Sequence, residues 1–343
     1  SSGLGSMAVI VANLQAMLAR TPRYDGVERR KPDGRSECAA TKLGASPSGR
    51  MSKTSELGGI AAMIAATAVF VIGDSFMKLV TEAVQPFEVL FLRGLAASAV
   101  CALLVAVRGE WHAIASAVHG RVLLRAAAET LSVLCYVVAL ARMPIADVIA
   151  ILQTAPLLVI VGAAILLRET IGPARIVLVL AGFAGALMVA QPNAAGVSSA
   201  ALLAFASALL IAVRDLVGRG VPARSPVMVV VLATNVTVTI VAGAMSFVTE
   251  TWVAPTGGQL AHLGAAGLLV TLGHAGVLLA YRLGRATSIA PFFYSFALWG
   301  LIAGAVVWGA LPNPVALTGI ALIVLSGVAI IVLDRRRRTS AVA

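Results

Sequence analysis

Apolar runs of about 20 residues, separated by short connections, fill almost the whole chain after Leu57. A helix of that length crosses the hydrocarbon core of a bilayer, which is about 30 Å thick. Proline stands at or just before most of the expected helix starts, in QPF, MPI, IGP, QPN, RSP and LPNP. The sequence therefore predicts an all-α membrane protein, surrounded by the lipid bilayer, with ten transmembrane helices at 57–80, 86–107, 121–141, 144–167, 173–190, 198–218, 226–248, 260–283, 287–310 and 314–333.

The distribution of charge gives the topology. The chain of 343 residues is 59% hydrophobic and 12% charged, with a formal net charge of +11. Of its 26 Lys and Arg residues, only Arg142 falls on the side opposite to the basic tails, and Lys78, Arg93 and Arg214 lie within spans. The positive-inside rule then predicts an even number of spans and cytoplasmic termini. Because topology accounts for the basicity, we predict no nucleic-acid partner.

The segments outside the spans leave no room for a folded soluble domain. Residues 1–56 form a predicted cytoplasmic tail, rich in Gly, Ser, Arg and Pro, that we expect to be disordered. Residues 335–343 form a basic cytoplasmic tail. Cys38, Cys101 and Cys135 lie in the first tail or within spans, which predicts neither a disulfide framework nor a metal site. The chain also lacks a Walker lysine motif for ATP, so we predict no cofactor.

The chain contains an internal repeat. The stretches FVIGDSFMKLVTEAVQPF and IAVRDLVGRGVPARSP align so that Asp74 matches Asp215 and Lys78 matches Arg219. A second pair of stretches, CYVVALARMPIADV and AYRLGRATSIAPFF, aligns farther along. The alignment predicts two repeats of five helices each.

These repeats cover residues 57–190 and 198–334 and are predicted to be inverted, because five crossings bring the second repeat into the membrane from the opposite side. Inversion separates the two aspartates in depth. Asp74 lies roughly 25 Å from the cytoplasmic face and Asp215 roughly 25 Å from the outer face, which leaves them some 20 Å apart. They therefore cannot share a proton as a catalytic aspartate pair must. An intramembrane aspartyl enzyme using Asp74 and Asp215 is the weaker alternative, and we predict that the chain is not an enzyme.

The run YVVALARMPIADVIAILQTAPLLVIVGAAILLRETIGPARIVLVLAGFAGALMVAQPN, with RDLVGRGVP and the closing TGIALIVLSGVAIIVLDRR, resembles the EamA-type transporters of the drug/metabolite transporter superfamily. The resemblance covers residues 57–334 and implies an inverted five-plus-five bundle with a central cavity and alternating access. One departure is visible. Relatives often carry an acid near the end of span nine, matching Glu169 after span four, but this chain reads WGALPNP.

This resemblance implies a secondary transporter for a small organic metabolite in the bacterial inner membrane. Relatives carry amino acids, S-adenosylmethionine, riboflavin, sugars and drugs, so an amino-acid-like, vitamin-like or S-adenosylmethionine-like substrate is expected. Coupling to protons or to a counter-substrate is expected as well, and a monomer and a homodimer both remain open. The alternative on the same fold is an exporter of amino acids or drugs.

Charged residues within the spans are the first candidates for substrate binding or coupling, because an isolated charge in a bilayer is costly. Asp74 and Lys78 lie one helical turn apart and can neutralise each other. Asp215 with Arg219 forms the matching pair. Two such pairs at opposite ends of a cavity suit alternating gates, and a purely structural role is the other interpretation.

Two further charged residues lie deep within spans. Arg93 is roughly 10 Å below the outer surface and needs a partner from another helix, whereas Glu88 is expected at a solvated position. Glu129 is roughly 12 Å deep and can act as a proton carrier or as a counter-ion for a cationic substrate. The alternative is that Glu129 only pairs with Arg125, one turn earlier.

Polar and aromatic residues within spans complete the set of candidates: Gln153, Asn235, His274, Tyr281, Tyr294 and Trp299. Gln153 lies near Pro156, which frees a backbone carbonyl in the middle of span four. Tyr294 and Trp299 can stack on a ring or cover a cation, with helix packing as the alternative. A bond to a neighbour on its own helix is the alternative for His274.

Overall fold

The computed structural model describes residues 53–167, 172–191, 197–218, 225–283 and 289–340. The predicted disordered tail, up to residue 52, lies outside these residues, and so does Arg219. The described elements are α2 (Lys53–Thr81), α3 (Pro86–Val107), η1 (Glu110–Val118), α4 (Gly120–Arg142), α5 (Ile145–Leu152), α6 (Ala155–Leu167), α7 (Pro173–Ala190), α8 (Ser199–Gly218), α9 (Val227–Thr249), α10 (Gly257–Leu283), η2 (Ala290–Tyr294), α12 (Ser295–Trp308) and α13 (Pro314–Ser340).

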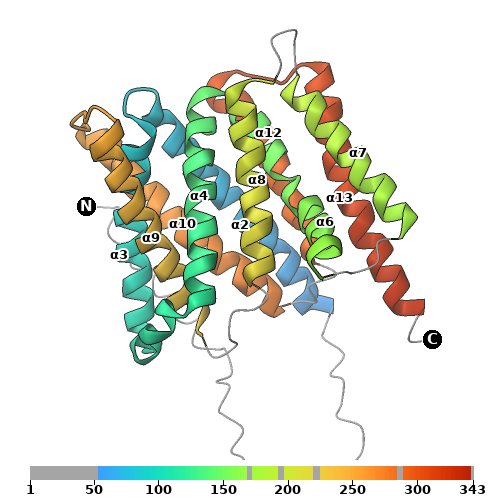
Figure 1. Cartoon of the computed structure of the whole chain (residues 1–343), viewed down its shortest axis with the longest axis horizontal. Coiled ribbons are helices and arrows are strands. Elements are labelled where there is room, and N and C mark those ends of the chain that lie inside the picture. Colours follow the sequence, from blue (N-terminus) through green and yellow to red (C-terminus); the bar gives the residue numbers. More distant parts are fainter. Residues whose placement is uncertain (1–52, 168–171, 192–196, 219–224, 284–288, 341–343) are drawn as a thin grey trace, which may run out of the picture. The chain divides into compact units, whose positions relative to one another are not determined.

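Within these residues, nine helical segments are long and apolar enough to cross a membrane, and a shorter apolar helix covers Phe292–Trp308. The predicted all-helical architecture with ten membrane helices is thereby confirmed. The start of α2 and the end of α13 lie at the same end of the bundle (Figure 1). We call the opposite end, where α4 joins α5 and α12 joins α13, the distal end.

Two of the spans are irregular, span four near its middle and span nine at its start. Span four breaks between α5 and α6, where Pro156 has no N–H to continue the helical hydrogen bonds. Span nine starts with the short 3-10 helix η2, which contains Pro291, before α12 begins. Gln153, at the first break, donates a hydrogen bond from Nε2 to the Phe293 carbonyl at 3.4 Å, so the two interruptions lie against each other.

Each long helix has a principal packing partner: α2 packs on α10, α4 on α8, α3 on α9 and α7 on α13. Lipid tails are as apolar as leucine, so close packing, more than burial from water, holds such helices together. At the α7–α13 contact, a Cβ added to Gly185 would lie 2.6 Å from the Gly319 carbonyl oxygen. Glycine at this position therefore permits the approach of the two backbones.

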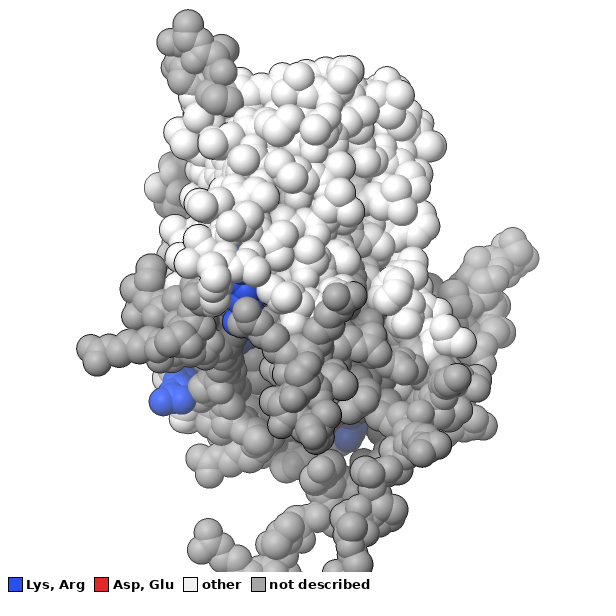
Figure 2. Space-filling view, turned by 90° about the vertical axis from the view of Figure 1, so that its right-hand side faces the viewer, with Lys and Arg blue, Asp and Glu red and all other residues white. Residues whose placement is uncertain are grey.

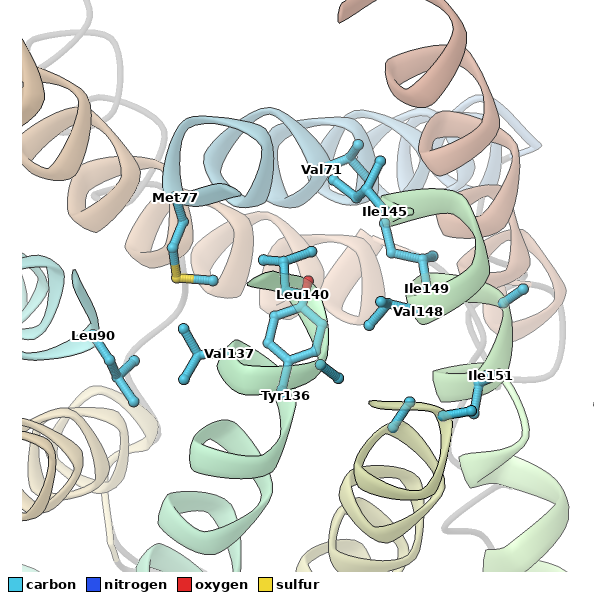
Figure 3. Close-up of a cluster of buried hydrophobic side chains, with 14 of the residues drawn as sticks. Val71, Met77, Leu90, Tyr136, Val137, Leu140, Ile145, Val148, Ile149 and Ile151 are labelled. Atoms are coloured by element: carbon cyan, nitrogen blue, oxygen red, sulfur yellow. The ribbon is translucent and has the colours of Figure 1, made fainter. Parts of the chain in front are cut away.

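The interior of the bundle is apolar and includes the side chains around Tyr136 in Figure 3, contributed mainly by α2, α4 and α5. Large apolar side chains also cover the outside: Val248 is 83% exposed, Val177 64% and Leu325 66%. Figure 2 shows a broad uncharged surface on one side of the bundle, with the visible Lys and Arg atoms near its lower end. Such a surface suits contact with lipid hydrocarbon.

Candidate functional site: a buried charged cavity

A small cavity lies between α3, α4, α9 and α10, with a volume of about 50 Å³. Its lining includes four of the predicted site residues, which are Arg93, Glu129, Asn235 and His274. A water molecule occupies about 30 Å³ of liquid, and ligand pockets usually measure 300–1,000 Å³. The helices must therefore move apart before a metabolite can occupy this site.

One side of the cavity carries a loose ion pair. Asp74 of α2 faces Arg93 of α3 at 3.8 Å, and the two side chains are only 13% and 12% exposed. The buried Nε of Arg93 has no hydrogen-bond partner within the described part of the chain. The buried Tyr136 hydroxyl lies beside the Asp74 carboxylate. Arg93 thus finds the interhelical partner that the sequence required, and its Nε remains free.

The predicted neutralisation of Asp74 by Lys78 is not what the structure shows. Lys78 instead donates from Nζ to the carbonyl oxygens of Leu140 and Met143, at 2.6 and 2.8 Å. These carbonyls belong to the end of α4, where helix geometry leaves them without intrahelical partners and where a cation is favoured. The ammonium group also lies 5.7 Å from the centre of the Trp308 ring.

Another part of the site carries a tight charged network on α4 and α8. Arg214 Nη1 donates to Glu129 Oε2 at 2.6 Å, and Arg214 Nε donates to Asp215 Oδ1 at 2.8 Å. The Arg125 guanidinium donates to Thr234 Oγ1 at 3.3 Å and lies close enough to interact electrostatically with Glu129. The direct partner of Glu129 is therefore Arg214, and not Arg125, which was the alternative interpretation.

Sequence reasoning assigned no role to Arg214, although it placed this basic residue within a span. The signal that could have found it was the same cost of burying a charge that selected Arg93. Asp215 is 45% exposed and bonds to its neighbour Arg214. The proposed match between Asp215–Arg219 and Asp74–Lys78 lies partly outside the described residues.

His274 places an aromatic surface beside the cavity. Its Nδ1 lies 2.7 Å from the Val270 carbonyl oxygen, one turn earlier, so Nδ1 carries the proton and Nε2 is left as an acceptor. The His274 ring meets Phe70 edge-on at 5.1 Å, and Phe70 meets Phe296 edge-on at 6.3 Å. The neighbour on its own helix thus fixes the ring, which still lines the cavity.

Four predicted site residues lie elsewhere or cannot be placed. Gln153 is 2% exposed and links the two interrupted spans. Trp299 donates from its indole N–H to the Ile64 carbonyl at 3.1 Å, which ties α12 to α2. Tyr294 packs against Gly327 of α13. The Tyr281 side chain lies outside the described part, and none of the other three lines the cavity.

Glu88 was expected at a solvated position, and this expectation was wrong, because the residue is 0% exposed. Its Oε2 accepts the Val253 N–H at 3.1 Å. The carboxylate of Glu250 in turn accepts the N–H groups of Phe87 and Glu88, at 2.9 and 3.0 Å. The N-terminus of α3 has unpaired N–H groups and a positive dipole end, which explains why it attracts the Glu250 carboxylate.

Membrane-crossing helices around a buried polar cavity define a multi-pass membrane protein with a site for a small molecule. In the part of the chain described, no group of three or more His, Cys, Asp or Glu side chains could hold a metal ion. Two of the charged residues that line the cavity are paired with charges behind its wall, Arg93 with Asp74 and Glu129 with Arg214.

Comparison with known proteins identifies the family. Residues 57–191 match the EamA-like transporter family. A riboflavin transporter of Rhizobium johnstonii is 33% identical over 63% of this chain and 72% of its own length. A riboflavin transporter of Vibrio cholerae is 30% identical over 53% of this chain and 61% of its own length. The chain belongs to the EamA-like transporter family, and is thus a drug/metabolite-type membrane transporter of a small molecule and not an enzyme.

The fold has a counterpart among solved structures. One crystal structure, described only as "Crystal structure of protein", superposes with a TM-score of 0.59 and 21% identity. It covers 82% of this chain and 98% of its own. This likeness supports the arrangement of the helices and carries no information about the substrate.

Proposed function

We propose that the chain transports riboflavin, or a closely related flavin, across the bacterial inner membrane by alternating access. The observation that carries the proposal is the charge balance around the cavity, taken with two relatives that bear the name riboflavin transporter. Three cations and three carboxylates surround the site: Arg93, Arg125, Arg214, Asp74, Glu129 and Asp215. A balanced set favours a neutral polar substrate, because a strongly charged one would leave an unpaired charge in low dielectric.

The groups around the cavity suit both the polar edge and the flat aromatic surface of a flavin. The dioxopyrimidine edge of the ring system presents alternating acceptors and one donor. The free Nε of Arg93 and the amide of Asn235 can complement such an edge. The flat aromatic surface of the ring system can pack against His274 and, once the helices separate, against Phe70 behind it.

Alternating access is supported by the order in which the helices pack. If each helix of the first repeat is exchanged with its counterpart in the second, the contact of α2 with α10 becomes that of α8 with α4. The contacts of α3 with α9 and of α7 with α13 are kept under the same exchange. This is the pattern expected of the two inverted repeats that we propose, with the cavity between them.

We assign the coupling role to Glu129, with a proton as the partner. If Glu129 takes up a proton, Arg214 keeps Asp215 as a counter-ion, and Asp215 also interacts electrostatically with Arg125. Neutralising Asp74 would leave Arg93 without its partner. Glu129 is therefore the carboxylate that can change charge at the lower cost. The test is uptake measured against external pH, and the pH profile should differ between the parent and Glu129→Gln. An unchanged rate and an unchanged pH profile would show that Glu129 has no role in coupling. That result would point to exchange with a counter-substrate.

Transport of radiolabelled riboflavin into proteoliposomes containing the purified protein tests the substrate. Saturable uptake that unlabelled riboflavin suppresses is expected, and Asn235→Leu should lower it at least tenfold. Glu110→Gln, on the short η1 helix away from the cavity, is the matched control and should transport like the parent. Uptake of an amino acid or a cationic drug in place of riboflavin would refute the proposal, and flux from preloaded vesicles gives the direction.

Reporter fusions expressed in cells test the topology. A reporter fused after Ala343 should be active only in the cytoplasm, and one inserted at Ser198 only outside it. A C-terminal reporter that is active outside would contradict both the cytoplasmic termini and the inverted repeats.

A further inference from the structure

A second, larger pocket opens at the distal end of the bundle, away from the charged cavity. Its volume is about 320 Å³, and its lining includes Lys78, Arg142 and Trp308 together with the backbone around Pro144 and Ala310. It therefore lies where α4 passes into α5 and where α12 passes into α13 (Figure 1). None of its lining residues also lines the charged cavity.

Arg142 gives this pocket an unused positive charge. It is the basic residue that the predicted topology places in a loop on the side opposite to the tails. Its side chain is exposed and makes no ion pair or hydrogen bond within the described residues. All five N–H donors of its guanidinium thus remain available to a ligand.

Lys78 adds a second, partly used cation. Two of the three N–H donors of an ammonium group are taken by the carbonyls of Leu140 and Met143. The third donor remains, and the lysine stem holds the charge in place beside Trp308. Glu82 interacts electrostatically with this group, but its carboxylate accepts the Trp308 indole N–H at 2.9 Å, and it does not line the pocket.

The surroundings of the pocket point to a lipid as the source of the anion. Val306 is 78% exposed and Leu311 is 72% exposed, on either side of Trp308 in the chain. A tryptophan flanked by exposed apolar residues at the end of a span is typical of the boundary between hydrocarbon and headgroups. Arg and Lys side chains at this level can form charge-assisted hydrogen bonds to the phosphate of an anionic headgroup.

We propose that this distal pocket binds the phosphate group of an anionic phospholipid, through Arg142 and the free donor of Lys78. Its volume exceeds what a bare phosphate needs and leaves room for the attached glycerol. Trp308 forms the wall between the headgroup and the acyl chains. The bound lipid would connect α4 and α12, which belong to different repeats.

The test is a titration of the purified, delipidated protein with phosphatidylglycerol, followed by native mass spectrometry. One tightly bound lipid is expected, and phosphatidylcholine should bind far more weakly because choline neutralises its phosphate. Arg142→Gln should weaken phosphatidylglycerol binding about fivefold, since one basic residue near a membrane surface contributes about 1 kcal/mol. Arg108→Gln, at the opposite end of the bundle, is the matched control and should bind like the parent.

Two results would overturn the proposal. If inorganic phosphate or glycerol 3-phosphate displaces the lipid at equal concentration, the pocket serves a soluble phosphate and not a lipid. If Arg142→Gln binds phosphatidylglycerol as tightly as Arg108→Gln, the pocket is not the binding site. Lys78→Met gives an independent check: circular dichroism first establishes that it folds, and it should then also lose affinity.

Discussion

The two ion pairs beside the cavity are built differently. Asp74 and Arg93 face each other at 3.8 Å, and Arg93 Nε is left without a partner in the described structure. Glu129 and Arg214 are bonded at 2.6 Å, and Arg214 holds a second carboxylate, Asp215, at 2.8 Å. Arg93 in the first pair has an N–H donor without a partner, and Arg214 in the second pair has a second carboxylate as a partner.

This difference indicates that the two ion pairs have different roles. Removing a buried cation is most costly when more than one carboxylate depends on it, as Glu129 and Asp215 depend on Arg214. Spare buried donors, by contrast, are ready to bind a ligand that brings acceptors. We therefore expect the Asp74–Arg93 pair to contribute mainly to substrate binding, and the Glu129–Arg214 pair to contribute mainly to stability and coupling.

The largest effect is expected from Arg214→Met. It leaves Glu129 and Asp215 without their shared cation and should lower the free energy of unfolding by about 3–5 kcal/mol. The measurement is thermal or denaturant unfolding in detergent, compared with the parent. The double variant Arg214→Met with Glu129→Gln should recover part of the loss, and a double variant that is less stable than the single one would contradict the pairing.

Arg93→Met sharpens the comparison, because the same chemical change is made in the looser pair. Since its ion pair is longer and its Nε has no partner, we expect a smaller loss of about 1–3 kcal/mol. Riboflavin uptake should nevertheless fall at least as much as in Arg214→Met, after correction for the amount of folded protein. Equal losses of stability in the two variants would abolish the distinction between the pairs.

Asp74→Asn and Asp215→Asn compare the two aspartates that the internal repeat matches. Asp74 is buried beside the cavity, whereas Asp215 is 45% exposed. Transport should therefore fall about tenfold in Asp74→Asn and about threefold in Asp215→Asn, which correspond to about 1.4 and 0.6 kcal/mol. Both should be lower than Glu110→Gln at equal expression. Normal transport in both variants would make the pairs purely structural.

The smallest effect is expected away from the cavity, at the N-terminus of α3. Glu250→Gln keeps the hydrogen-bonding shape but removes the charge that faces the helix dipole, at a cost of about 0.3–1 kcal/mol. Unfolding in detergent measures it, and riboflavin affinity should not change. A loss as large as that of Arg93→Met would show that charge burial in general, and not the cavity, sets the scale.

The sequence was most informative about the membrane-spanning helices and least informative about the ion-pair partners of the buried charges. Runs of apolar residues located the membrane helices, and Pro156 indicated the interruption of span four, because a missing N–H acts within one turn of its own helix. The cost of a buried charge correctly selected Arg93 and Glu129 as residues that need partners. It did not identify those partners, since neither Asp74–Lys78 nor Arg125–Glu129 forms the direct pair.

Spacing along one helix tells which residues share a face, but not which face meets which neighbour. Lys78 turns to the end of α4 because unpaired carbonyls lie there, and Arg93 turns to Asp74 because α3 passes beside α2. Glu88 was placed at a solvated position by depth alone, yet the segment around Val253 covers it. The sequence by itself therefore determined the membrane class, the helix spans and the need for buried charge compensation, which follow from local hydrophobicity. Only the tertiary structure decided which charges compensate each other and which donors remain free, because these depend on how the helices are rotated against one another.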